Sequence, residues 1–281
     1  MDTPTEYLTP FSHLENKTKK HKNWYNPEFV GVFCKELNAS SRLFDSKSLQ
    51  REFDANYQVL EMKDRLKLIC DLVEKHYPAP YLEQLAAFQS LLYQKWPFEE
   101  GMFSYGYHLY PISQFVERHA AKNLKASISF IEKLTQRFTG EFALRAVANA
   151  DEKITLSTVK MWSQSKSFHV RRLASEGVRP RLPWGQNITW VSENPKKILP
   201  IYSRLRNDPV LYVRRSVANA MADIIKTDSA LALATFEKWL SKKNTKENTW
   251  VIKHAIRKPK KENDYDFVEL QKYLNKISTR F

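Results

Sequence analysis

The chain has 281 residues, and 45 Lys and Arg against 31 Asp and Glu give it a formal net charge of +14. Its 6 Gly and 13 Pro are too few for folds built on many tight turns, such as β-sandwiches, and a hydrophobic share of 42% argues against a disordered chain. Cys34 and Cys70 are the only two cysteines, which excludes a disulfide framework and a Cys-rich zinc site.

The apolar runs of the sequence are short. None approaches the roughly 18 residues that a membrane-spanning helix needs, and the polar start lacks the apolar segment of a secretory signal. We therefore expect a cytoplasmic protein without a membrane partner. The surplus of positive charge is typical of proteins that bind a polyanion such as nucleic acid.

The first 25 residues are rich in lysine, with a basic run at 17–22. We expect residues 1–25 to form a loose basic N-terminal arm, for which a solvated tail is the simplest interpretation. Helices are predicted from residue 26 onward, and 26–258 is predicted to be a domain of helical repeats. Residues 259–281 are predicted to form a basic C-terminal helix or tail.

Two early segments show the apolar spacing of a helix with one buried face, namely 60–74 and 81–92. The following segment, 96–112, is dense in aromatic residues. We interpret it as a loop or short helices whose rings pack on the scaffold; a platform on which nucleic-acid bases stack is the alternative.

Four later segments resemble one another: FALRAVAN from Phe142, HVRRLASE from His169, YVRRSVAN from Tyr212 and WVIKHAIR from Trp250. Aligned on their shared basic position they are separated by 27, 43 and 38 residues, and the last two intervals suit a two-helix HEAT-type unit. The sequence therefore predicts an all-α fold, a right-handed curved solenoid of HEAT-like repeats with a concave DNA-binding surface.

Each repeated segment has two predicted faces. The apolar faces are Val170, Leu173, Ala174 and Gly177 in the second segment, and Val213, Val217, Ala220 and Ile224 in the third. The polar stripes are Glu141, Arg145 and Asn149; Arg172 and Glu176; Arg215, Asn219 and Asp223; Lys253 and Arg257. Stacked repeats would align these stripes into a basic surface that carries three carboxylates.

Those carboxylates admit two interpretations. Pairs such as Glu141–Arg145 and Arg172–Glu176 are spaced by four residues, and such pairs commonly decorate a helix surface. A surface that binds phosphates is, however, weakened by every carboxylate on it. Recurrence of the acids across three repeats points to a function, and a cationic ligand lying among the phosphates would explain them.

The segment GVRPRLPWG, from Gly177 to Gly185, follows the second repeat. Gly177 is predicted to end the helix, and two prolines stiffen a loop that presents Arg179, Arg181 and Trp184. The tryptophan either fills a gap between helices or contacts a ligand. The two arginines contact phosphate or, without a partner, solvent.

The segments HVRRLASEGVRPRLPW, FTGEFALR and YVRRSVANAMADI resemble the AlkC branch of the HEAT-like DNA alkylation-repair glycosylases, with looser similarity over residues 30–258. The resemblance implies a DNA glycosylase that removes cationic N-alkylated bases, 3-methyladenine and 3-methylcytosine, without a deep base pocket. It maps the active-site acids onto Glu141, Glu176 and Asp223. Trp184 matches the active-site aromatic residue, and Arg172 matches an arginine that holds the carboxylates and the backbone.

The chemistry suits these residue types. An N3-alkylated base already carries positive charge and leaves readily, and the sugar then gains oxocarbenium character that a carboxylate stabilises. We expect a monomeric, monofunctional glycosylase acting on double-stranded alkylated DNA, with Glu176 as the leading carboxylate and no cofactor or metal. The expected DNA contacts are Arg145, Arg171, Arg179, Arg181, Arg214, Arg215, Asn219, Lys253, His254 and Arg257. The alternative is a non-catalytic HEAT scaffold that binds DNA structures or a protein.

Overall fold

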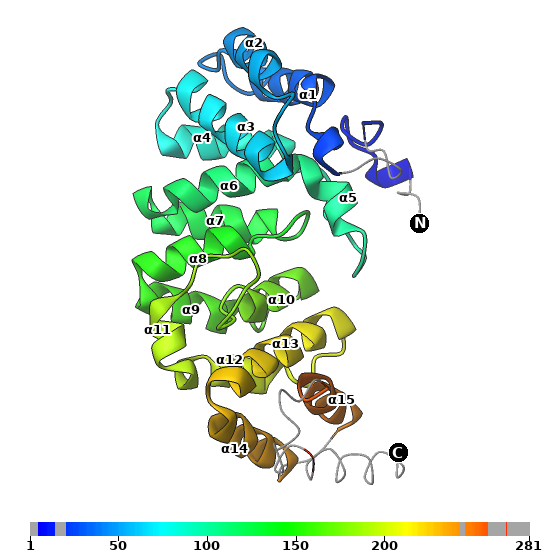
Figure 1. Ribbon diagram of the computed structural model, residues 1–281, viewed down its shortest axis with the longest axis vertical. Helices are drawn as coiled ribbons and strands as arrows, with labels where there is room; N and C mark the ends of the chain where they lie inside the picture. Colours follow the sequence, from blue (N-terminus) through cyan, green and yellow to red (C-terminus); the bar gives the residue numbers. More distant parts are fainter. Residues whose placement is uncertain (1–4, 15–20, 242–244, 258–267, 269–281) are drawn as a thin grey trace. The chain divides into compact units, whose positions relative to one another are not determined.

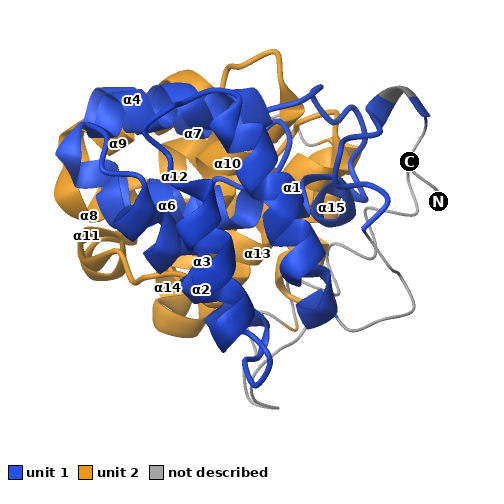
Figure 2. Cartoon of the chain, turned by 90° about the horizontal axis from the view of Figure 1, so that it is seen from above, with its two compact units in different colours: residues 1–147 blue, residues 148–281 orange. Residues whose placement is uncertain are grey.

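The computed structural model describes residues 5–14, 21–241, 245–257 and 268 (Figure 1). All regular elements in these ranges are helices, so the prediction of an all-α helical-repeat fold is confirmed. The lysines at 17–20 and nearly all of the predicted C-terminal tail lie outside the described residues. The chain divides into two compact units, residues 1–147 and 148–281 (Figure 2).

Unit 1 is a stack of short helices. They are α1 (Pro27–Asn38), α2 (Ser46–Asn56), α3 (Met62–His76), α4 (Tyr81–Phe88), α5 (Met102–Gly106), α6 (Tyr110–His119), α7 (Leu124–Leu134) and the larger part of α8 (Glu141–Ala150). In this unit α1 packs on α2, α2 on α3 and α3 on α6, whereas α4 and α6 both contact α7. The helices predicted at 60–74 and 81–92 are α3 and α4, the latter followed by a short 3-10 turn.

Polar side chains fix where many of these helices begin. Asn26 accepts a hydrogen bond from the backbone N–H of Phe29, and Asp45 does the same for Ser48. Asn123, Asp151, Asp228 and Thr245 cap later helices in the same way. Each cap satisfies a backbone donor that the helix itself leaves unpaired.

The prediction of a loose arm is wrong for residues 5–14 and 21–25. Phe11 and Tyr25 are 0% exposed. The Phe11 ring stacks on His108 with 4.6 Å between ring centroids, and the Tyr107 hydroxyl donates a hydrogen bond to the Phe11 carbonyl at 2.9 Å. Buried Arg65 donates to the carbonyls of Lys22 and Tyr25. The prediction was based on the lysine content of this segment. Its packing is determined instead by the aromatic residues that lie on both sides of the lysines.

The aromatic segment 96–112 is part of the core of unit 1. Trp96 stacks on Tyr105 with 4.7 Å between centroids, and Tyr107 is 0% exposed. Gly106 allows the segment to approach the backbone of residue 137, since a Cβ at this position would lie 2.2 Å from the Arg137 carbonyl oxygen. For these residues the interpretation as buried packing is confirmed.

Unit 2 contains the later repeats. Its helices after α8 are α9 (Glu152–Trp162), α10 (Phe168–Glu176), α11 (Thr189–Glu193), α12 (Leu199–Leu205), α13 (Leu211–Thr227), α14 (Ser229–Leu240) and α15 (Lys246–Ala255). Helix α13 packs against both α10 and α15, so three of the four similar segments are neighbours, which we call the repeat row (Figure 1). Helices α9, α12 and α14 pack against this row.

The apolar faces predicted for α10 and α13 are confirmed. Val170, Leu173, Ala174, Val213, Val217, Ala220 and Ile224 are all 0% exposed. Close packing of these apolar faces against the neighbouring helices fixes the positions of α10 and α13. The repeat row therefore provides a rigid support for the polar side chains that it carries.

Replacing Phe11 with Ala should destabilise the protein, because it removes a fully buried ring and its stack on His108. We expect the free energy of unfolding to fall by about 3 kcal/mol or more, measured by urea denaturation. Leu8→Ala is the matched control, because Leu8 is 54% exposed and should change stability little. Equal stabilities of the two variants would contradict the packing of the N-terminal segment.

Candidate functional site

The structure brings together two of the three predicted carboxylates. Glu176 is the last residue of α10, Asp223 lies in α13, and their side chains are 7% and 5% exposed. Arg179 Nη1 lies 2.6 Å from Glu176 Oε1, and Nη2 of the same residue lies 2.9 Å from Asp223 Oδ2. Arg179 Nε donates a further hydrogen bond to Asp223 Oδ2 at 3.0 Å. One guanidinium thus joins the two acids; we call these three residues the carboxylate cluster.

The role of Arg179 differs from the one expected from sequence. From the sequence, Arg179 was expected to contact phosphate or solvent. Arg172 was expected to hold the carboxylates. In the structure Arg172 Nη2 lies 3.6 Å from Glu176 Oε1, and its guanidinium lies 5.0 Å from the centre of the Tyr212 ring. Arg179 makes the shorter contacts and alone reaches both acids among the contacts described.

The two acids differ in pKa. Burial disfavours the charged form of Glu176, but Arg172, Arg179 and the Ser216 hydroxyl outweigh it and hold the pKa of this carboxyl below its ordinary value. Burial dominates at Asp223, whose pKa is raised although Arg179 opposes the shift. Glu176 is therefore the carboxylate that stays ionised most readily.

A hydrogen bond between two buried serines fixes the approach of α10 to α13. The hydroxyls of Ser175 and Ser216 are 2.7 Å apart, and both residues are at most 1% exposed. Ser216 also supports the charge of Glu176. Small hydroxyl side chains at this contact let the helices pack closely and satisfy their own polar atoms.

The loop from Gly177 to Gly185 is anchored at several points. The Tyr202 hydroxyl donates to the Val178 carbonyl at 3.1 Å, the backbone of Arg181 hydrogen-bonds Asp223, and Leu182 is 8% exposed. These contacts fix the loop to the carboxylate cluster.

Trp184, near the end of this loop, is 73% exposed, so the interpretation as a plug between helices is wrong. Its φ of 66° lies in the left-handed region that favours glycine. A non-glycine residue in this region costs about 1–2 kcal/mol. The fold therefore presents a large ring on strained backbone, an arrangement common at ligand sites.

Glu141 is the first residue of α8 and belongs to unit 1. It is half-buried, and its backbone N–H donates to the Thr139 hydroxyl at 3.4 Å. Its grouping with the carboxylate cluster stays a prediction.

Besides Arg179, three predicted DNA contacts are corrected. Arg145 is 1% exposed, and a guanidinium buried to this degree cannot contact a phosphate. Arg171 binds Asp208 with both Nε and Nη2, at 2.6 and 3.0 Å, and Arg214 donates to the Asp208 and Pro209 carbonyls. Arg171 and Arg214 therefore hold the turn before α13 in place. Arg171 and Arg214 each precede a residue of the polar stripes by one position, and helical periodicity gave no signal of this turn contact.

The other predicted contacts remain available at the surface. Arg181, Arg215 and Arg257 are exposed, and Asn219, Lys253 and His254 are half-buried. The Arg257 guanidinium donates to Asn219 Oδ1 at 3.3 Å, which connects α15 to α13. Burial, followed by Arg257 and Arg215, lowers the pKa of His254, which indicates a positive local potential.

In the described part of the chain, no group of three His, Cys, Asp or Glu side chains is placed so that it could hold a metal ion. None of the described helices combines the length and apolar character needed to cross a bilayer.

The chain is similar in sequence to a bacterial protein and in structure to a solved DNA glycosylase. No family model matches the chain. The uncharacterized protein YhaZ of Bacillus subtilis is 33% identical over 261 residues, which is 90% of this chain and 68% of YhaZ. The solved structure of Pseudomonas fluorescens alkylpurine DNA glycosylase AlkC, bound to DNA containing an abasic site analog, is similar with a TM-score of 0.75 and 29% identity. This match covers 89% of the present chain and 67% of the solved chain.

Arg179→Met should destabilise the fold in a pH-dependent way. It leaves two buried carboxylates without their shared cation, and breaking a buried ion pair costs about 3–5 kcal/mol. Both carboxyl pKa values should then rise, so protonation on acidification relieves the repulsion and the difference from wild type should shrink from pH 7 toward pH 4. Urea denaturation across this range measures the effect.

Arg181→Met is the control, because that side chain is exposed and only its backbone meets Asp223. A loss of stability in Arg179→Met that is the same at every pH would contradict the assigned role.

Proposed function

The chain belongs to the AlkC branch of the HEAT-like DNA alkylation-repair glycosylases, and on this basis we propose that it excises cationic N-alkylated bases, such as 3-methyladenine and 3-methylcytosine, from double-stranded DNA. We propose that it acts as a monofunctional enzyme and as a cytoplasmic monomer. The observation that carries the proposal is the carboxylate cluster, held on adjacent helices and joined by its loop to an exposed tryptophan.

The charges of this region account for selectivity. The exposed cations of the repeat row attract the phosphates, whereas Glu176 is kept ionised among them. An N-alkylated base carries a positive charge that an undamaged base lacks. A carboxylate within a few ångströms therefore favours the damaged nucleotide without recognising the shape of the base in a pocket.

The proposed reaction is hydrolysis of the N-glycosidic bond. The bond breaks toward the base, whose positive charge is neutralised by the electron pair, and the sugar gains oxocarbenium character. Water adds at the anomeric carbon and gives up a proton, for which a carboxylate is the natural acceptor. At about 4 Å a carboxylate stabilises the sugar cation by roughly 4 kcal/mol for an effective dielectric near 20, about a thousandfold in rate.

The other site residues have supporting roles in this proposal. Asp223, whose pKa is raised, and Glu141 add negative charge as the sugar becomes cationic, and Arg179 keeps Glu176 and Asp223 in place. Trp184 stacks on the sugar or the cationic base, worth about 0.5–2 kcal/mol. Arg181, Arg215, Asn219, Lys253, His254 and Arg257 are proposed to contact phosphates and set the register of the duplex.

Glu176→Gln should abolish most base release while DNA binding persists. The amide keeps the shape of the side chain but removes its charge, so the single-turnover rate on methylated duplex DNA should fall about a thousandfold. Release of free methylated base, measured by chromatography, reports the rate. Glu237→Gln, on the exposed face of α14, is the matched control. Binding of methylated DNA without base release by the wild-type protein would instead select the scaffold function.

Trp184→Gly and Trp184→Ala should separate stability from activity. Both remove the ring and should slow base release by up to about thirtyfold if the full contact is lost. Only glycine relieves the left-handed backbone, so the glycine variant should be more stable than the alanine variant by about 1 kcal/mol. Thermal unfolding and the glycosylase assay together test this. An alanine variant as stable as the glycine variant would show that the backbone is not strained.

A further inference from the structure

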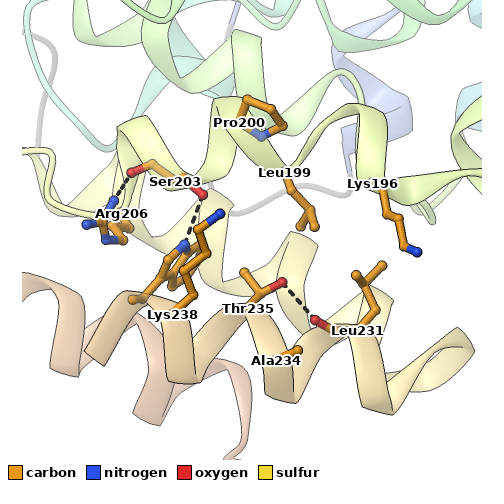
Figure 3. A pocket seen from close by; sticks show the side chains of 10 residues that line it. Lys196, Leu199, Pro200, Ser203, Arg206, Leu231, Ala234, Thr235 and Lys238 are labelled. Carbon is orange, nitrogen blue, oxygen red and sulfur yellow. Dashed lines mark hydrogen bonds between the residues drawn. The ribbon is translucent and has the colours of Figure 1, made fainter. Parts of the chain in front are cut away.

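Unit 2 contains a groove on helices outside the repeat row. This groove of about 520 Å³ lies between α12, with the residues just before it, and α14 (Figure 3). Helix α14 contributes Leu231, Ala234, Thr235 and Lys238, which are spaced as one face of a helix. None of the ten lining residues bears a carboxylate.

The groove has an apolar middle and cationic ends. Figure 3 shows Arg206 and Lys238 at one end, Lys196 toward the other, and Leu199 between them. Figure 3 shows Leu231 on the side of Lys196, and from Leu231 to Lys238 the helix rises by about 10 Å. The positive charges are thus too far apart to bind one small anion together, and the apolar floor separates them.

At one cationic end of the groove, the guanidinium of Arg206 uses only part of its hydrogen-bonding capacity within the described structure. Its guanidinium lies 5.6 Å from the centre of the Trp239 ring, and its Nη1 donates to the Ser203 carbonyl. Its Nε–H is buried without a hydrogen-bond partner in the described structure, and no described carboxylate lies within ion-pair distance. Burial lowers the pKa of Arg206. A half-buried cation of this kind is stabilised when an anionic group binds beside it.

We propose that this groove binds an acidic, apolar peptide segment of a partner protein. Carboxylates four residues apart lie on the same face of an extended segment, span about 13 Å and would reach the two cationic ends. A leucine-like side chain midway between them, on the same face, would cover Leu199 and Leu231. A nucleic-acid backbone matches less well, because its charge is continuous and it has no use for an apolar floor.

The proposal is tested with the full chain and a fluorescein-labelled peptide of sequence Gly-Glu-Ser-Leu-Ser-Glu-Gly, by fluorescence anisotropy. Peptides with Ser in place of Leu, or Lys in place of both Glu, should bind at least about tenfold more weakly, since one contact class is lost in each. Equal binding of the Ser peptide would overturn the apolar contact, and the absence of binding at millimolar peptide would overturn the site.

Matched variants locate the binding. Ala234 is exposed and lines the groove, so Ala234→Glu should repel the acidic peptide and weaken it at least about tenfold. Met161→Glu places the same charge at an exposed position of α9 outside the lining and should leave binding within about twofold. Equal effects of the two variants would overturn the assignment.

Two further measurements separate this proposal from others. Base release by both variants should equal that of wild type, because neither residue belongs to the carboxylate cluster, so the result does not depend on the proposed glycosylase activity. Unmodified duplex DNA should not displace the peptide from the groove. Displacement by DNA that is lost in Ala234→Glu would identify a nucleic-acid site and overturn the peptide proposal.

Discussion

The contact of Arg179 with Glu176 and Asp223 is the constraint on which the site depends. Two carboxylates buried on neighbouring helices repel each other and lose their hydration, and either cost alone would favour protonation or separation of the helices. A single guanidinium offsets both costs, at 2.6 and 2.9 Å. This contact requires that α10 and α13 pack closely. It also requires that the loop after α10 bring Arg179 between the two acids.

The same contact explains how negative charge persists in a protein with a formal net charge of +14. The arginines around Glu176 hold its pKa low, so the charge is present at neutral pH. The burial of Asp223 acts in the opposite direction. Two acids of similar chemistry are thus made different by their surroundings, which is how paired carboxylates acquire separate roles in catalysis.

Much of this arrangement could be predicted from sequence, and the exceptions share a cause. Helical periodicity gave the buried faces of α10 and α13 and placed Glu176 and Asp223 on adjacent repeats, because that information is local. It could not place Arg179, whose partner Asp223 is 44 residues away in sequence. Nor could it show that Arg145 is buried, because a helical stripe does not distinguish an exposed cation from a buried one.

The N-terminal segment of unit 1 has a consequence for how the protein is made. The carbonyl of Phe11 accepts its hydrogen bond from Tyr107, 96 positions later in the chain. A nascent polypeptide leaving the ribosome therefore lacks this partner of Phe11 until 96 further residues have been synthesised. Contacts of such long sequence separation form late and slow folding. Molecular chaperones that bind apolar nascent segments would have to cover Phe11 throughout this interval.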